Sequence, residues 1–203
     1  MATTASDAAP GWRRAGIGLL VLACLWLPPG MADGRMAKAF RQWARDHDIT
    51  AFQTYLREHG IRRLPPANEL VATASDWQRC GASAFDIPPR AHWPQAAATY
   101  RLLDHLADRG IVRDYRVVST WRNPDLNACA GGAARSTHAR HYAVDLIPEG
   151  NGVDVPALCA FWKREGRRWN MGLSRYPSGR IHIDVVRYRT WGADHSGATA
   201  FCR

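Results

Sequence analysis

The chain of 203 residues is 46% hydrophobic and 22% charged, and its 27 Lys and Arg against 18 Asp and Glu give a net charge of +9. This balance predicts one globular domain with a sizeable core, and it excludes a disordered chain, a collagen-like repeat and a multi-pass membrane protein. Only Lys38 and Lys163 are lysines. Nearly all the positive charge is therefore guanidinium, which binds phosphate and carboxylate groups through a planar fork of donors.

The amino terminus has the pattern of an export signal. Two arginines precede an apolar stretch from Ala15 to Leu27, which is shorter than the ~20 residues of a membrane span. Small residues then permit cleavage after Ala32. We expect residues 1–32 to be a signal peptide and the protein to be exported to the periplasm or cell envelope. A lipid anchor at Cys24 and an uncleaved amino-terminal anchor are the alternatives, and in either case only this segment would contact the membrane.

Cleavage at this position would leave an even number of cysteines in an exported chain. Such a count predicts two disulfides, which form in oxidising compartments. The separations of 49, 30 and 43 residues contain no close pair of the kind that a zinc–thiolate site needs. The sequence leaves three pairings open among the four cysteines, which are Cys80, Cys129, Cys159 and Cys202.

The mature chain begins with two helical patterns, and we expect residues 33–66 to form an accessory helical hairpin. Met36, Phe40 and Trp43 have helical spacing in the first. The second follows an expected capping box of Thr50 and Gln53, and it ends at a glycine.

Residues 67–203 alternate further helices with short strands. A helix is expected from Trp93 to Asp108, and a later one is capped by Asp154. Strands are expected at Tyr115 to Thr120, Ala143 to Ile147 and Arg180 to Val186. This order predicts an α+β fold and gives no sign of an internal repeat.

Two of these strands carry polar side chains at informative positions. Because side chains alternate along a strand, His182 and Asp184 share one face of the third strand, opposite its isoleucines. A solvent-facing His–Asp pair is the simpler interpretation of that strand. Asp145 lies within the apolar second strand, where a carboxylate needs a cation or strong donors nearby. His138 stands seven residues earlier.

Two histidines and an aspartate are a ligand set typical of catalytic zinc. Such a site uses three protein ligands and leaves one position open for water. Bound zinc lowers the pKa of that water and polarises a carbonyl group. His138, Asp145 and His182 are therefore candidate zinc ligands, although chance alone could supply such a combination.

Three sequence blocks resemble one family. Residues 136–145, Ser-Thr-His-Ala-Arg-His-Tyr-Ala-Val-Asp, match four of the five fixed positions in the S-x-H-x-x-G-x-A-x-D signature of the zinc D-Ala-D-Ala carboxypeptidases and murein endopeptidases. Residues 119–127 are similar to the family's S-x-Y-R-s-p…N segment. Residues 172–191 resemble the tail of its periplasmic murein endopeptidase branch. The resemblance covers roughly residues 112–191.

This resemblance implies a hedgehog/DD-peptidase-like domain, with a small antiparallel sheet and flanking helices. It implies that His138, Asp145 and His182 bind zinc. Arg122 would bind a substrate carboxylate or polarise the scissile carbonyl and stabilise its oxyanion; its alternative is a structural arginine that closes a turn beside Asp125.

The sequence departs from the family at two places. His141 replaces the signature glycine, and it could support a ligand, carry protons or lie on the surface. Gly179 and Arg180 occupy the positions where other members place a Glu, Asp or His before the last ligand. By elimination we expect Asp184 to be the general base; alternatively it holds His182 or Arg122 in place.

The expected function is zinc-dependent hydrolysis of amide bonds in peptidoglycan stem peptides or cross-links, by an endopeptidase that acts as a monomer. A D,D-carboxypeptidase is one alternative, and a non-catalytic zinc-containing module that binds the cell wall is another. The positive charge alone would also suit nucleic acid, but the chain has no basic helix, aromatic RNA-binding motif or zinc finger. We therefore expect no nucleic-acid partner.

Overall fold

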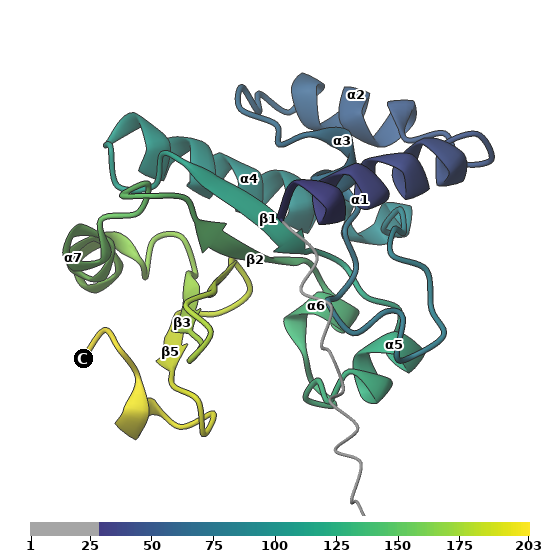
Figure 1. The fold of residues 1–203 in the computed structure, drawn as a ribbon. Helices are drawn as coiled ribbons and strands as arrows, with labels where there is room; N and C mark the ends of the chain where they lie inside the picture. Colours follow the sequence, from purple (N-terminus) through teal and green to yellow (C-terminus); the bar gives the residue numbers. More distant parts are fainter. Residues whose placement is uncertain (1–28) are drawn as a thin grey trace, which may run out of the picture.

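A single sheet organises the structure, which is a computed structural model that describes residues 29–203 (Figure 1). Residues 1–28 of the expected signal peptide lie outside the described residues. The helices are α1 (Pro29–Trp43), α2 (Thr50–Glu58), α3 (Ala67–Leu70), η1 (Arg90–His92), α4 (Trp93–Asp108), α5 (Pro124–Cys129), α6 (Thr137–Arg140), α7 (Val155–Glu165) and η2 (Gly197–Thr199). The strands are β1 (Tyr115–Ser119), β2 (Ala143–Pro148), β3 (Gly172–Arg175), β4 (Ile181–Asp184) and β5 (Arg189–Trp191).

The five strands follow the order β1-β2-β4-β3-β5. All neighbouring pairs are antiparallel except β3 and β5, which are parallel. The fold is therefore α+β with a mostly antiparallel sheet, as the sequence predicts. The three expected strands correspond to β1, β2 and β4. The two that the sequence did not predict, β3 and β5, are short and lack a clear alternation of apolar and polar residues.

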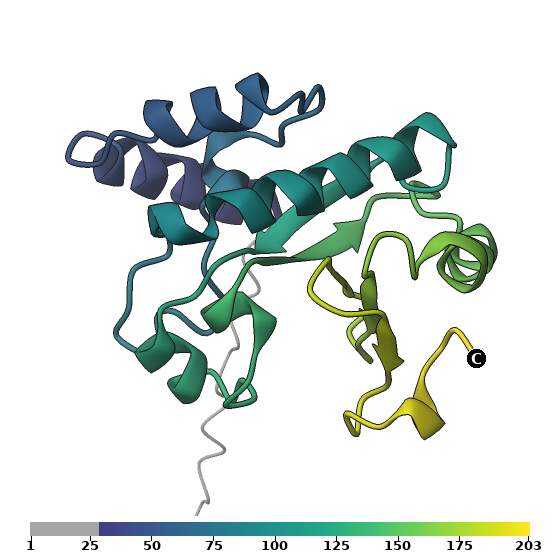
Figure 2. The ribbon, with the colours of Figure 1, turned by 180° about the vertical axis from the view of Figure 1, so that it is seen from behind.

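Helix α4 lies across β1 and β2 on one face of the sheet (Figure 2). It has the bounds that the sequence predicts, with Pro94 in its first turn and Gly110 just beyond its end at a φ of +69°. Leu102 and Leu106 of this helix, together with Val144 and Ile183 of the sheet, belong to the main hydrophobic core. This packing fixes β2 and β4, the strands that carry Asp145 and His182.

The two helices of the expected hairpin pack against different parts of the molecule. Phe52 and Leu56 of α2 are fully buried in the main core. Phe40 and Trp43 of α1 pack instead on a smaller cluster that contains Phe85. Residues 33–66 thus contribute to both clusters of the fold.

The expected capping box at Thr50 is wrong. Helix α2 begins at Thr50, after Ile49 at the N-cap, and no side-chain cap is formed. The amide of Thr50 donates instead to the Asp48 carboxylate at 2.8 Å. The Asp48 carboxylate therefore satisfies the backbone amide of Thr50. Thr50 is the first residue of the helix, whereas a capping box would place it at the N-cap. The cap at Asp154 is confirmed, because its side chain accepts from Ala157.

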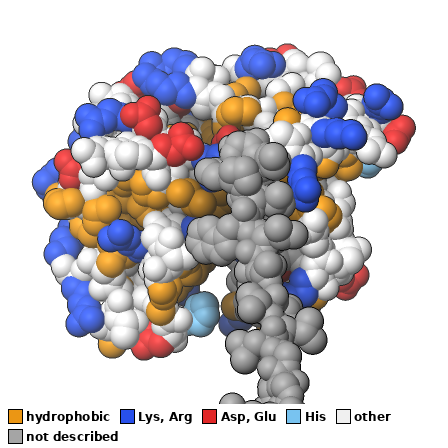
Figure 3. Space-filling view, in the orientation of Figure 1, with side chains coloured by type: hydrophobic (Ala, Val, Ile, Leu, Met, Phe, Trp, Pro, Cys, Tyr) orange, Lys and Arg blue, Asp and Glu red, His pale blue; other side chains and the backbone are white. Residues whose placement is uncertain are grey.

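The four cysteines form two disulfides, Cys80–Cys129 and Cys159–Cys202. This resolves the pairing that the sequence left open, and it indicates an oxidising, exported environment. No helix within residues 29–203 is long and apolar enough to cross a membrane. On the face shown in Figure 3, basic side chains are spread among acidic and apolar ones.

Candidate metal centre and its pocket

The three predicted ligands converge in the buried interior. His138 comes from α6, Asp145 from β2 and His182 from β4, and one donor atom of each lies within 4.8 Å of the others. The sheet register produces this arrangement, because Asp145 and His182 are cross-strand partners. All three residues are at most 5% exposed. The structure thus brings together residues that are up to 44 positions apart.

His138 is oriented by a bond on the far side of its ring. Its Nδ1 lies 2.5 Å from the carbonyl oxygen of Thr120. A carbonyl only accepts, so Nδ1 carries the proton and Nε2 keeps a free lone pair. That lone pair faces Asp145 Oδ1 at 3.1 Å and His182 Nδ1 at 3.1 Å. This is the tautomer in which a histidine ligates a metal through Nε2.

His182 presents its other ring nitrogen to the centre. Its Nε2 donates to Asp184 Oδ2 at 2.9 Å, which leaves Nδ1 facing Asp145 Oδ1 at 2.9 Å. Both histidines therefore donate outward, so each could present its other ring nitrogen to a metal ion. Carboxylate–histidine pairs of this kind fix the ring and increase its basicity as a ligand.

The surroundings shift the pKa of all three groups. Burial lowers the pKa of His138 and so favours its neutral form. Although burial opposes ionisation of Asp145, the adjacent His138 and His182 lower the pKa of Asp145 well below its usual range. Burial also opposes the charged form of His182, but hydrogen bonds to Asp145 and Asp184 raise the pKa of His182.

The donor set fits zinc. Zinc–ligand bonds of about 2.0–2.1 Å at tetrahedral angles separate neighbouring donor atoms by roughly 3.3 Å. The three separations here are 2.9, 3.1 and 3.1 Å. Two inward-facing nitrogen lone pairs beside a carboxylate oxygen also need a shared cation or proton. The group can thus hold a metal ion, and its composition is typical of zinc.

Asp184 lies behind His182, on the side away from the donor atoms. It is fully buried and forms a two-point ion pair with Arg189, whose two terminal nitrogens lie 3.0 and 2.6 Å from its oxygens. Burial opposes ionisation of Asp184. Hydrogen bonds from His182 and Arg189, and the attraction to their charges, nevertheless lower the pKa of Asp184. The expected role as general base does not fit this position, because the carboxylate faces His182 Nε2 and Arg189. The contacts fit the alternative, in which Asp184 holds His182.

A glycine on the neighbouring strand leaves room for this ion pair. Gly172 of β3 lies opposite Asp184 of β4. A Cβ atom on Gly172 would clash with the Asp184 carboxylate and lie 2.6 Å from an Arg189 terminal nitrogen. Arg189 also stacks on Trp191, with its guanidinium carbon 4.6 Å from the ring centroid. Gly172, Asp184, Arg189 and Trp191 form a support behind His182. In the sequence they were visible only as part of the family resemblance of residues 172–191.

The metal-ligand group lies at an open pocket of about 590 Å³. One wall comes from the loops that follow β1 and α5, and the other comes from the segments around β4 and β5. The lining residues with charged or titratable side chains, besides the three ligands, are Asp76, Arg122, Arg135, Tyr176, Arg180, Arg187, Arg189 and His195.

Arg122, which we expect from the sequence to bind substrate, lines this pocket. Its backbone amide donates to the carbonyl of His138 at 3.0 Å, so the residue is tied directly to the ligand segment. Burial lowers the pKa of Arg122, which the nearby Asp145 carboxylate opposes. Its Nε is buried and has no hydrogen-bond partner among the described residues.

Ser136, the first residue of the matched signature, and His141, at its glycine position, differ in their placement. Ser136 lines the pocket, and its side chain makes no capping bond at the start of α6. His141 is the C-cap of α6 and has a φ of −141°, outside the left-handed region that favours glycine. It is not among the lining residues, and its charge acts instead on His92, whose pKa is lowered by burial and by His141.

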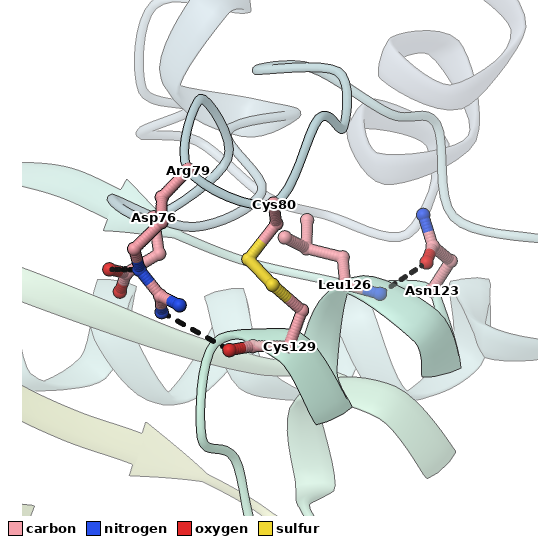
Figure 4. Close-up of a disulfide and its surroundings, with 6 residues drawn as sticks. All are labelled: Asp76, Arg79, Cys80, Asn123, Leu126 and Cys129. Carbon is pink, nitrogen blue, oxygen red and sulfur yellow. Dashed lines mark hydrogen bonds and ion pairs between the residues drawn. A yellow bond between two sulfur atoms is a disulfide. The ribbon is translucent and has the colours of Figure 1, made fainter.

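Sequence reasoning missed much of the pocket wall. Ser75 and Asp76 come from a stretch without periodicity, and His195 lies beyond the region of family resemblance. His195 has a φ of +60°, uncommon for a residue other than glycine. The cysteines gave no direct signal, because their pairing was open in the sequence; in the structure Cys80–Cys129 joins two of the wall segments (Figure 4).

Comparisons of the chain with protein-family models, curated proteins and solved structures find no match.

Proposed function

We propose that the protein is a zinc-dependent peptidase that hydrolyses amide bonds in peptidoglycan stem peptides or cross-links, as an endopeptidase of the periplasm or cell envelope. The observation that carries the proposal is a buried His–Asp–His donor group at the base of an open pocket. The proposed domain is of the hedgehog/DD-peptidase type, as the three sequence motifs suggest. It would act as a monomer.

In this proposal, His138, Asp145 and His182 hold the zinc. Bound zinc would supply Lewis-acid activation of water and of the scissile carbonyl. Thr120 and Asp184 keep the two histidine rings oriented through the nitrogens that face away from the centre. The ligand lone pairs are therefore positioned before substrate arrives, which reduces the reorganisation needed during reaction.

Arg122 and Tyr176 would act on the substrate from the pocket wall. The guanidinium of Arg122 can bind a substrate carboxylate, or donate to the carbonyl oxygen as negative charge develops on it. Burial, and next the charge of Asp145, raise the pKa of Tyr176. Its hydroxyl thus keeps its proton and can donate a hydrogen bond within the pocket.

A second function is favoured by the placement of the carboxylates. Among the described residues that line the pocket, the acidic ones are the ligand Asp145 and Asp76, which pairs with Arg79 at 3.2 Å. Asp184 faces away from the centre. A pocket without a free carboxylate to accept a proton suits a zinc-containing module that binds the cell wall without cleaving it.

Incubation with purified peptidoglycan separates these functions. The peptidase should release new amino groups in a reaction that a chelator stops and added zinc restores. New amines within cross-links identify an endopeptidase, whereas free D-alanine identifies a D,D-carboxypeptidase. A protein that binds both zinc and peptidoglycan but releases nothing would overturn the peptidase and support the binding module. Asp145→Asn, which removes a ligand charge, is the matched inactive control.

A further inference from the structure

The pocket holds more positive charge than its carboxylates balance. Five arginines line it, and Arg189 is paired with Asp184. The other four, which are Arg122, Arg135, Arg180 and Arg187, form no ion pair with a carboxylate within residues 29–203. Like charges gathered in a partly enclosed pocket repel one another, and a bound anion relieves that repulsion.

Arg122 and Arg180 are the half-buried members of this set. Arg122 is fixed through its amide to the His138 carbonyl. Arg180 stands two residues before His182, just before β4, and its Nη1 donates to Ser75 Oγ at 3.0 Å. The contact with Ser75 occupies one of the five guanidinium N–H groups, so Arg180 keeps a set of donors for a ligand.

Both arginines lie near the metal-ligand group, yet they come from separate segments. Each charge acts on Tyr176, and the charge of Arg180 also acts on Arg122. The two guanidinium groups thus line the same pocket as Asp145. Each has a fork geometry that matches a carboxylate of a ligand bound there.

We propose that Arg180 is a specificity-determining residue, which binds a side-chain carboxylate of an acidic peptide while Arg122 contacts a second group of the same substrate. This inference rests on the proposed peptidase function for its choice of a peptide. The proposal assigns a role to Arg180, which occupies a position where the resembled family has an acid or a histidine. The exposed Arg135 and Arg187 add to the same attraction at the pocket wall.

Two peptides that differ by one group test the proposal. Acetyl-D-glutamyl-D-alanine has a side-chain carboxylate, and acetyl-D-glutaminyl-D-alanine has an amide of almost the same shape. Their binding to the zinc-loaded protein is measured by calorimetry, independently of hydrolysis, which is followed by release of D-alanine. We expect the wild type to bind the glutamyl peptide at least ~10-fold more tightly, as a hydrogen-bonded charge pair would give.

Two variants assign this preference to a residue. Arg180→Gln should reduce the ratio of the two affinities to about 1, and Arg180→Lys should keep part of it. Arg175→Gln removes the same charge from an exposed arginine of β3 that does not line the pocket, and it should keep the wild-type ratio. Circular dichroism and zinc content verify that each variant is folded.

Three results would overturn the proposal: equal affinity of the wild type for both peptides, binding of neither peptide at millimolar concentration, or an unchanged ratio in Arg180→Gln. Selective binding without any release of D-alanine would support the anion site at Arg180 and count against carboxypeptidase turnover of this peptide. Hydrolysis of both peptides at equal KM and kcat would instead support a peptidase and remove Arg180 as its specificity determinant.

Discussion

Single residues on the far side of the ligands decide how the metal centre is held. Thr120 accepts from His138, and Asp184 accepts from His182. Each bond fixes both the tautomer and the ring orientation. Asp184 is itself fixed by two nitrogens of Arg189. These contacts fit a positioning role for Asp184 better than the role of general base expected from the sequence, because the carboxylate is buried and accepts from His182, Arg189 and the Val186 amide.

The Asp184→Asn variant tests this positioning role. An amide removes the carboxylate charge from His182 and leaves Arg189 without its ion-pair partner, so zinc affinity should fall by roughly 10- to 100-fold. A competition titration with a coloured chelator measures that affinity. Asp194→Asn, on an exposed carboxylate, is the control. Unchanged zinc affinity together with abolished turnover would return Asp184 to the role of proton acceptor.

The Gly172→Ala variant tests the same support without changing any polar group. The added methyl group would clash with the Asp184 carboxylate and with Arg189. The ion pair must then shift, and we expect zinc affinity to fall in the same assay. Gly197→Ala is a matched control, since its Cβ would lie 3.9 Å from the Thr190 carbonyl oxygen, which is ordinary contact. Equal zinc affinity in both variants would contradict the proposed support.

Elements that are distant in sequence form the pocket, and a disulfide connects two of them. Cys80 lies in the loop after Asp76, and Cys129 ends α5, just before the glycines of the opposite wall segment (Figure 4). Arg79 adds a hydrogen bond from its Nη2 to the carbonyl oxygen of Cys129 at 3.1 Å. Helix α5 is itself capped by the Asn123 side chain. The bridge thus joins two segments of the pocket that Arg122 also lines.

Removal of each disulfide should affect the pocket differently. The double substitution of Cys80 and Cys129 by serine should lower the free energy of unfolding by ~2 to 4 kcal/mol, because the unfolded chain gains freedom. It should also weaken binding of peptide ligands. The same change at Cys159 and Cys202 opens a similar loop, with a separation of 43 against 49 residues.

Urea unfolding and calorimetry measure the two effects in both double variants. We expect comparable losses of stability, with the loss of ligand binding larger for Cys80/Cys129. Equal loss of binding in the two variants would show that the effect follows global stability and not the pocket wall.

A metal ion bound at the donor group would add to the stability of the whole molecule. The donor group is buried between α6, β2 and β4, so bound zinc would connect three elements of the native state and be absent from the unfolded chain. At free zinc 1,000 times the Kd, this linkage contributes ~4 kcal/mol.

Such a contribution should raise Tm by roughly 10 °C for a chain of this size. Calorimetric scans with zinc and with chelator measure the shift. His138→Ala should show a much smaller response, since one ligand is missing. An equal response of wild type and variant would place the stabilising zinc elsewhere.

The sequence predicted the local parts of this molecule well. Alternation placed His182 and Asp184 on one face of β4, and the isolated acid in an apolar run marked Asp145 as needing a partner. Capping and glycine signals gave α4 its bounds and gave α7 its start. They failed at Thr50, where Asp48 supplied a competing acceptor. Short-range chemistry along the chain was sufficient for most of these features.

Only the tertiary structure decided which groups surround each candidate site residue. The strand pattern placed Asp184 beside His182, but the pairing of β4 with β3 and the parallel β5 bring Gly172 and Arg189 around it. The cysteine pairing and the unpaired pocket arginines are long-range outcomes of the same kind. The physical reason is that ligand type and strand alternation depend on neighbours along the chain, whereas burial, ion pairing and charge balance depend on what folding brings alongside.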